Sequence, residues 1–406
     1  EMNEEIGMYQ VNDQILIGLP ENPPALIASF QLEVAGQPFE FTVPVVYKEN
    51  DRVQGEVYRP FVVTPPVYVS LEEDVLFFIE DEPKSVEVLV KAGKDNINGT
   101  VQLNLPNGWK ASTNNIPYKL NKKGDEFRYQ LLITPPQVPS DDYVTVSTQL
   151  DGKVYDRGLR TIDYDHIPYQ MVFPKTEVRV VKADVQIRGE KVGYIMGSGD
   201  EIPASLEQMG YTVDLLNPER INETLLAAYD AVVVGVRAFN TIERMSFVQP
   251  ELMKFVQAGG TVIVQYNTSM RDQPPIGPYP FSISRDRVTD EFAEVRILAP
   301  EHPVMNIPNK ITTKDFEGWV QERGLYFPNE WDNRYTPILS ANDKGESPKN
   351  GGLLVAEYGK GFFVYTGYSW FRELPPGVPG AYRIFANLVS LGQDNKAEEM
   401  NAQKDK

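Results

Sequence analysis

One short stretch, HPVMNIPNKITTKDFEGWVQERGLYF, gathers many side chains capable of chemistry. These side chains are His302, Asp315, Trp319, Gln321, Glu322 and Arg323. A histidine near carboxylates can act as a general base in hydrolysis, so His302 and Glu322 are candidate catalytic residues. Aromatic rings mixed with amide, carboxylate and guanidinium groups also suit sugar recognition. In the alternative interpretation, His302 only forms a turn with Pro303, and Trp319 belongs to the core.

A second segment, YTGYSWFRELPPG, places an aromatic and basic cluster directly after the last predicted strand. It adds Tyr368, Trp370, Phe371 and Arg372. We expect this segment and the preceding stretch to meet over one crevice. The candidate ligand-binding residues are Arg237, Asn240, Asn267, Asp315, Trp319, Gln321, Arg323, Tyr368, Trp370 and Arg372.

Further candidates lie in the loops that follow predicted parallel strands. Arg237 and Asn240 come after AVVVGV, and Asn267 comes after TVIVQ, where an open α/β sheet places its ligand contacts. A structural role in tying loops together is an equally good interpretation of Arg237. Ser269 is a hydroxyl nucleophile in a plausible place, but no G-x-S-x-G sequence accompanies it. Helix capping or ligand hydrogen bonding by the Asn-Thr-Ser run is the favoured interpretation.

Two other clusters have a structural interpretation that we prefer. Gly197-Ser198-Gly199 superficially suggests a phosphate cradle, but Asp200 and Glu201 would repel a phosphate, so we expect a tight turn followed by a helix cap. In the segment TIDYDHIPY, two aspartates and one histidine could bind a metal. A hydrogen-bonded domain junction explains them better. We therefore predict no metal site and no cofactor.

Composition excludes several classes of function. The chain has 406 residues and no cysteine, which removes disulfides, thiolate metal sites and thiol nucleophiles. Its formal net charge of −18 would repel a phosphate backbone, so nucleic acid is not an expected partner. No apolar run approaches the roughly 20 residues that a membrane-spanning helix needs.

The pattern of apolar residues predicts a multidomain protein. Alternating strands with turn signals predict two β-sandwich-like modules, and apolar strands linked by helices then predict an α/β domain with a mainly parallel sheet. The expected divisions are a β-rich module at 1–65, an immunoglobulin-like β-sandwich at 66–174, a linker at 175–190, the α/β domain at 191–393 and a disordered tail at 394–406.

Several long strings in the last half of the chain resemble a known family. GYIMGSGDEIPASLEQMGYTVDLL, DAVVVGVRAFNT, GGTVIVQYNTS and FFVYTGYSWFRELPPGVPGAYRIFANL resemble the C-terminal half of large bacterial LmbE-like (PIG-L family) deacetylases, over roughly residues 191–392. The same region is also similar to the trehalose-utilisation branch of the class I glutamine amidotransferases. That second resemblance implies a flavodoxin-like fold for the α/β domain.

The sequence departs from both families at their catalytic residues. The AHPDD-type zinc motif of the deacetylases is absent, and the chain contains only two histidines, His166 and His302. The amidotransferase cysteine is also missing. The resemblance therefore implies a non-catalytic accessory region of a secreted, glycan-processing deacetylase, which binds carbohydrate or a partner.

The same resemblance implies the surroundings of this region. Its partner in the same polypeptide would be an upstream N-acetyl-sugar deacetylase domain, behind a signal peptide that directs the protein to the periplasm or the extracellular space. Two alternatives stay open. The α/β domain could be a hydrolase centred on His302 and Glu322, or it could be a purely structural dimerisation module.

Overall fold

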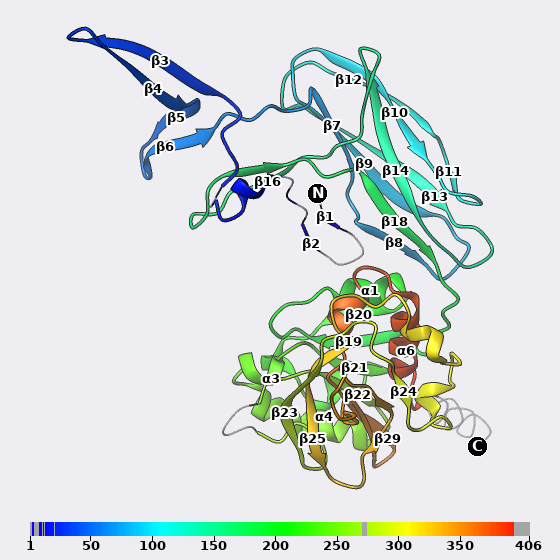
Figure 1. Cartoon of the computed structure of the whole chain (residues 1–406). Coiled ribbons are helices and arrows are strands. Elements are labelled where there is room, and N and C mark those ends of the chain that lie inside the picture. The colour runs from blue at the N-terminus through cyan, green and yellow to red at the C-terminus, as the bar shows by residue number, and fades with distance from the viewer. Residues whose placement is uncertain are drawn as a thin grey trace.

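The computed structural model describes residues 2–3, 8–9, 11, 13–19, 21–269 and 274–393. The chain runs from an extended N-terminal arm, through a β-sandwich, to a larger C-terminal region (Figure 1). Within the described part, no helix is both long enough and apolar enough to cross a membrane. The predicted tail at 394–406 lies outside the described residues.

The N-terminal arm consists of two separate β-hairpins. One pairs β3 (Ile27–Val34) with β4 (Gln37–Pro44), and the other pairs β5 (Val46–Asp51) with β6 (Gly55–Pro60). Before them lie the short pair β1 (Met2–Asn3) and β2 (Met8–Tyr9) and the 3₁₀ helix η1 (Gln14–Leu16). The prediction of a sandwich-like module here is wrong, because no second sheet covers either hairpin within the described residues.

A β-sandwich follows the arm. Its larger sheet contains β12 (Asn115–Leu120), β10 (Ile97–Asn104), β14 (Ser140–Leu150), β18 (Glu177–Lys182) and β8 (Val75–Phe78) in that order, with β15 (Lys153–Tyr155) paired to β14. Its smaller sheet contains β11 (Lys110–Ala111), β13 (Glu126–Thr134), β9 (Lys84–Ala92) and β7 (Val67–Leu71). A short pair, β16 (Arg160–Ile162) and β17 (Gln170–Val172), lies beside it.

Alternation of apolar and polar residues builds this sandwich, as the sequence predicts. In β9, Val86, Val88 and Val90 are buried, while the residues between them are less buried. Their side chains join those of the facing sheet in one core, because successive residues of a strand point to opposite faces. The strand β18 lies in the segment 175–190 that the sequence pattern assigned to a linker.

The C-terminal region is built on one seven-stranded sheet. Its strands, in spatial order, are β20 (Thr212–Leu215), β19 (Lys191–Ile195), β21 (Ala231–Val234), β22 (Thr261–Gln265), β29 (Gly361–Thr366), β28 (Leu353–Tyr358) and β26 (Thr336–Pro337). Two further pairs join β23 (Phe281–Val288) to β25 (Gly324–Trp331) and β24 (Arg296–Ile297) to β27 (Leu339–Ser340). Two apolar cores cover the two faces of the seven-stranded sheet.

The helices of this region are mostly short. They are α1 (Ile202–Gln208), α2 (Glu223–Leu226), α3 (Ala238–Thr241), α4 (Met245–Gln257), α5 (Trp370–Glu373) and α6 (Pro379–Val389). The 3₁₀ helices are η2 (Pro218–Arg220), η3 (Pro303–Met305) and η4 (Thr313–Phe316). The two longest, α4 and α6, contact β22 and belong to different cores.

The predicted fold class is wrong. The described chain is mostly β, with 41% strand and 15% helix, and within it there is no flavodoxin-like, mainly parallel α/β domain. In the described C-terminal region, four strand pairings are parallel and four are antiparallel. Apolar strand runs alone do not give strand direction, and one of the helices that link the parallel strands, α2, has only four residues.

The sandwich and the C-terminal region share two strands. Strands β8 and β18 pair in parallel, so that Leu76 lies opposite Val180 and Phe77 opposite Val181. Leu76 and Val180 belong to the sandwich core, whereas Phe77 and Val181 belong to a core of the C-terminal region. Phe77 stacks on Tyr382 of α6, with ring centroids 3.7 Å apart. The two faces of this strand pair therefore connect the sandwich to the C-terminal region.

Candidate functional site

The candidate site lies where four parallel strands of the seven-stranded sheet end. Strands β19, β21, β22 and β29 are parallel neighbours, so their carboxyl ends lie along one edge. Backbone hydrogen bonds tie the loops at this edge together: Gly235 N donates to Ile195 O at 2.8 Å, and Arg237 N donates to Tyr266 O at 2.9 Å. These bonds hold the following side chains in place.

Asn240 and Asn267 tie the loops after β21 and β22 to each other. The Asn240 amide exchanges two hydrogen bonds with the backbone of Thr268, at 3.0 and 2.8 Å. Asn267 is fully buried; its Oδ1 accepts from Phe239 N, and its Nδ2 donates to Gln265 O. Both side chains hold loops, and a ligand-binding role for them stays a prediction.

A buried hydrogen-bond chain that the sequence reading missed runs beneath this edge. Gln265 Nε2 donates to Tyr194 Oη at 2.9 Å, and Tyr194 Oη donates to Asp200 Oδ1 at 2.6 Å. Burial, with the Asp200 charge, raises the pKa of Tyr194 well above its usual value, so the phenol keeps its proton. Asp200 Oδ1 also accepts from the backbone N–H of Ile202, the first residue of α1, whose N-cap residue Glu201 makes no side-chain cap.

Three half-buried rings form what we call the edge cluster: Tyr266, Tyr326 and Phe371. The rings of Tyr266 and Tyr326 are stacked, with centroids 5.9 Å apart and planes within 7° of each other. Phe371 lies on Tyr266 at 5.4 Å. Phe371 belongs to the predicted aromatic segment. Tyr266 and Tyr326 were not predicted as site residues. Tyr266 directly follows an apolar strand, and this position is the signal that could have identified it.

Basic and amide groups surround the edge cluster. Arg372 donates to Glu322 Oε1 at 2.9 Å and to Gln321 Oε1. Burial raises the pKa of Tyr266, and the nearby cations of Arg237 and Arg372 oppose that shift. Arg237 Nε is buried without a hydrogen-bond partner, and no ion pair joins Arg237 to a carboxylate of the described chain.

The backbone at the edge cluster adopts a rare conformation. Arg237, Gln321 and Tyr326 have φ values of 57°, 68° and 54°, in the left-handed region that non-glycine residues seldom occupy. Each non-glycine residue in this conformation lowers the stability of the fold by roughly 1–3 kcal/mol, and such residues are concentrated at functional sites. Three of them beside one group of rings single out this edge as a candidate binding site.

The structure corrects the role expected for the two tryptophans. Trp319 and Trp370 do meet, with ring centroids 5.3 Å apart, but they are 2% and 0% exposed. Tyr368, also buried, packs on both. Side chains enclosed in this way form core rather than a surface for a sugar ring. Sequence spacing showed that the two segments are aromatic, but it does not show which face of each loop is covered.

Arg323 and Asp315 are buried as well, and each has structural partners. Arg323 donates from Nε and Nη2 to Ala293 O and from Nη1 to Phe316 O. Asp315 forms a capping box with Thr312 at the start of η4 and an ion pair with Arg383 at 2.8 Å. Of the predicted ligand-binding residues, Arg237, Gln321 and Arg372 are the ones that the structure brings to the edge cluster.

His302 and Glu322 do not form a catalytic pair in this structure. His302 Nδ1 accepts from Val304 N at 3.2 Å and caps η3, and burial lowers the pKa of the imidazole. Glu322 is engaged with Arg372. Neither a hydrogen bond nor an ion pair joins His302 to Glu322, both of which are described. A hydrolytic role for them stays a prediction without geometric support.

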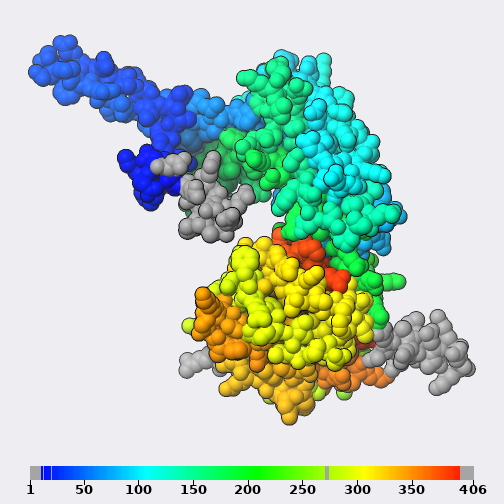
Figure 2. Space-filling model, turned by 45° about the vertical axis from the view of Figure 1, so that its right-hand side comes forward, coloured from blue at the N-terminus to red at the C-terminus, as the bar shows by residue number. Residues whose placement is uncertain are grey.

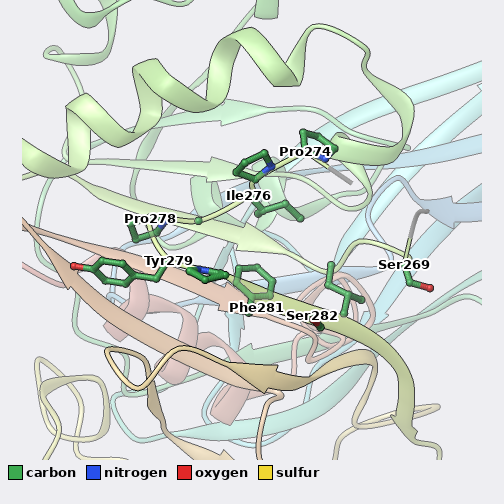
Figure 3. A pocket seen from close by; sticks show the side chains of 11 residues that line it. Ser269, Pro274, Ile276, Pro278, Tyr279, Phe281 and Ser282 are labelled. Atoms are coloured by element: carbon green, nitrogen blue, oxygen red, sulfur yellow. The ribbon is translucent and has the colours of Figure 1, made fainter. Parts of the chain in front are cut away.

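A pocket of about 590 Å³ lies beside the loop that follows β22. It is lined by Ser269 and residues 274–283, and its labelled side chains are mainly proline and apolar groups (Figure 3). None of the described lining residues is a histidine or a carboxylate, so they supply no base to activate the Ser269 hydroxyl. Taken over the described residues, no group of three or more His, Asp or Glu side chains is arranged to hold a metal ion.

One fully buried carboxyl group, that of Glu373 in α5, lies behind the site. Its Oε2 accepts from Val320 N at 2.9 Å, while its Oε1 has no hydrogen-bond partner. Burial raises the pKa of Glu373 to about 8, so the group is largely protonated at neutral pH. The hydroxyls of Tyr368 and Ser369 nearby in sequence are also buried without partners.

We expect this carboxyl group to make stability depend on pH. Its folded pKa of about 8 exceeds the value of about 4.3 in an unfolded chain. Between these two values the carboxyl group is protonated in the folded state but ionised in the unfolded state. Its contribution to the free energy of unfolding is therefore largest below about pH 4 and falls as the pH rises towards 8. The slope is at most about 1.4 kcal/mol per pH unit. Urea unfolding from pH 5 to 8.5 measures it.

The variant Glu373→Gln provides the control for this pH effect. Its amide oxygen can keep the hydrogen bond from Val320, but the side chain cannot ionise. The variant should therefore lose most of the fall in stability between pH 5 and pH 8. An equally steep fall in the variant would show that Glu373 is not the titrating group.

Comparison with known proteins gives no family for the chain. No protein-family model and no curated protein matches it. Among solved structures, Escherichia coli alpha-2-macroglobulin covers 37% of this chain and 9% of its own length, at 10% identity and a TM-score of 0.22. WR4, a Caenorhabditis elegans MSP family member, covers 28% of this chain and 97% of its own, at 9% identity and a TM-score of 0.18.

These structural matches are too weak to carry an argument about fold or function. They also offer no support for the predicted deacetylase family, which stays a prediction.

Proposed function

We propose that the chain is a non-catalytic region that binds a carbohydrate at the edge cluster. The observation that carries this proposal is the group of half-buried rings, Tyr266, Tyr326 and Phe371, bordered by Arg237 and Arg372. Apolar ring surfaces can pack against the C–H faces of a sugar, and guanidinium groups can donate to its hydroxyl or carboxylate oxygens.

The arginines favour a sugar that carries an acidic group. In a chain with a formal charge of −18, Arg237 lies at the cluster without a carboxylate partner among the described residues. A carboxylate or sulfate on the ligand would supply that partner, and a charge-assisted hydrogen bond is stronger than a neutral one. The proposed ligand is therefore an acidic glycan, with a neutral glycan as the weaker binder.

The proposal extends to the biological setting that the sequence resemblance implies. In that setting the region is an accessory part of a secreted glycan-processing protein, located in the periplasm or outside the cell, beside a deacetylase domain. The β-sandwich, compatible with an immunoglobulin-like module, would act as a spacer. The alternative hydrolase is not proposed, because His302 and Glu322 are each engaged elsewhere.

Replacing Tyr266 with alanine should weaken glycan binding about 10-fold or more, because the variant loses the ring on which both other aromatic residues pack. Calorimetric titration with a uronic-acid oligosaccharide and its neutral counterpart measures the affinity. Tyr143→Ala, which removes an exposed tyrosine on β14 of the sandwich, is the matched control and should bind like the wild type. Failure of the wild type to bind either glycan would reject the proposal.

A further inference from the structure

The β3–β4 hairpin has one face made almost entirely of apolar side chains. Residues directly opposite each other in the pairing share a face, and here Phe30 lies opposite Phe41 and Leu32 opposite Phe39. The face consists of the apolar residues Ala28, Phe30, Leu32, Val34, Phe39, Phe41 and Val43, with Gln37 as its one polar member. The other face is mainly polar, and on it Ser29 Oγ donates to Glu40 Oε1 at 2.6 Å.

This apolar face is not covered by the described part of the chain. Phe30, Phe39 and Phe41 are 50%, 56% and 58% exposed, and none of the hairpin belongs to a core cluster. The hairpin projects away from the body of the molecule, as Figures 1 and 2 both show. A lone two-stranded hairpin is marginally stable in water at best. A contiguous apolar surface of this kind marks an interaction site.

We propose that this face is covered by the same face of a second copy of the chain. Two such hairpins packed face to face would form a small two-layer sandwich, with the layers about 10 Å apart. The same surface would be used on both copies, as in a twofold-symmetric dimer. Each hairpin would then gain the second apolar layer that it lacks.

The area of the face lies near the lower limit for a specific dimer interface, because two such faces would bury on the order of 1,000 Å² in total. With the exposures above, the three phenylalanines contribute about 100 Å² each, and the five exposed apolar side chains together contribute on the order of 500 Å². A stable interface buries about 800 Å² on each partner. The half-buried Ala28 and Val43 and the polar rim of the hairpin would supply the remainder.

The charge of the chain also indicates where two copies can touch. Each copy carries a formal charge of −18, so two copies repel each other wherever acidic surfaces meet. The apolar face of β3–β4 contains no charged side chain, so it avoids this repulsion locally. Salt screens the remaining repulsion, so dimerisation should tighten as ionic strength rises.

Sedimentation equilibrium of the full chain tests the proposal. The wild type should be a dimer at tens of micromolar, more tightly associated in 0.5 M than in 0.05 M NaCl. Phe41→Glu, which would bury an unpaired charge, should weaken the dimer by about 100-fold or more. Thr42→Glu changes the neighbouring residue on the polar face and should leave the dimer nearly intact. A monomeric wild type in high salt, or equal effects of the two variants, would overturn the proposal.

A second measurement avoids substitution of the apolar face. Because the chain has no cysteine, Gln31→Cys on the polar face can carry a single nitroxide label. Labels on two face-to-face hairpins lie close enough for strong dipolar coupling between copies. The same label in a chain that also carries Thr42→Glu should give the same coupling. Absence of coupling at concentrations where sedimentation detects a dimer would mean that the copies associate through another surface.

Discussion

The variant Trp370→Ala is expected to lose about 3–5 kcal/mol of stability, the range for removal of a buried tryptophan. Trp370 is fully buried, packs against Trp319 and Phe385, and donates from Nε1 to Thr366 Oγ1 at 2.8 Å. Its removal would leave a cavity in this core and a buried hydroxyl, that of Thr366, with one hydrogen bond fewer. Urea unfolding followed by circular dichroism measures the change.

Phe247→Ala is the control for this loss of stability. Phe247 is 70% exposed, so its removal should change stability by no more than about 0.5 kcal/mol.

A different result for Trp370→Ala would contradict the assignment of Trp370 to the core. If Trp370→Ala kept the stability of the wild type but lost glycan binding, Trp370 would contact ligand in solution, and its position in the core would not describe the bound protein.

The variant Phe77→Ala should destabilise the chain by about 3–5 kcal/mol and separate the unfolding of its two main parts. The side chain of Phe77 lies outside the sandwich core and stacks on Tyr382, so it contributes to a core of the C-terminal region. Lys84 spans the same boundary and donates to Phe77 O and to Gln208 O. Calorimetry should therefore show one main transition in the wild type and two in the variant.

Leu76→Ala is the matched control for the separation of the two transitions. Leu76 is the neighbouring residue on β8, but it faces the sandwich core. Its removal should lower stability by about 2–5 kcal/mol while leaving the contact between the two regions in place. Two well-separated transitions already present in the wild type would contradict the interpretation of a shared strand pair.

Local sequence patterns predicted much of the secondary structure. Period-two alternation identified the strands of the sandwich, because a strand with one buried face needs it. The same rule predicted the strands of the arm but not how they pack, because alternation in β3 does not reveal whether a second sheet covers its apolar face. The antiparallel pairing of β28 with β29 is predictable from the sequence, because the apolar runs LLVAEY and GFFVYTG flank the tight turn YGKG.

The candidate site was predicted only in part, for a physical reason. Arg237 and Arg372 stood out because charged residues directly after apolar strands or in aromatic loops are uncommon. Tyr326 did not, because a left-handed backbone and a bulged pairing with β23 bring it to the edge, and no local signal encodes them. The burial of Trp319 depends on contacts with residues distant in sequence, which spacing does not reveal.

The pairing of β8 with β18 has a consequence for how the chain folds. These strands lie at the two ends of the sandwich sequence, and nearly all of the other sandwich strands come between them. The larger sheet therefore cannot be completed on the ribosome until β18 has emerged, and such distant pairing slows folding. A cut at the predicted boundary after residue 174 would remove β18, leaving β14 and β8 with unpaired edges that invite aggregation.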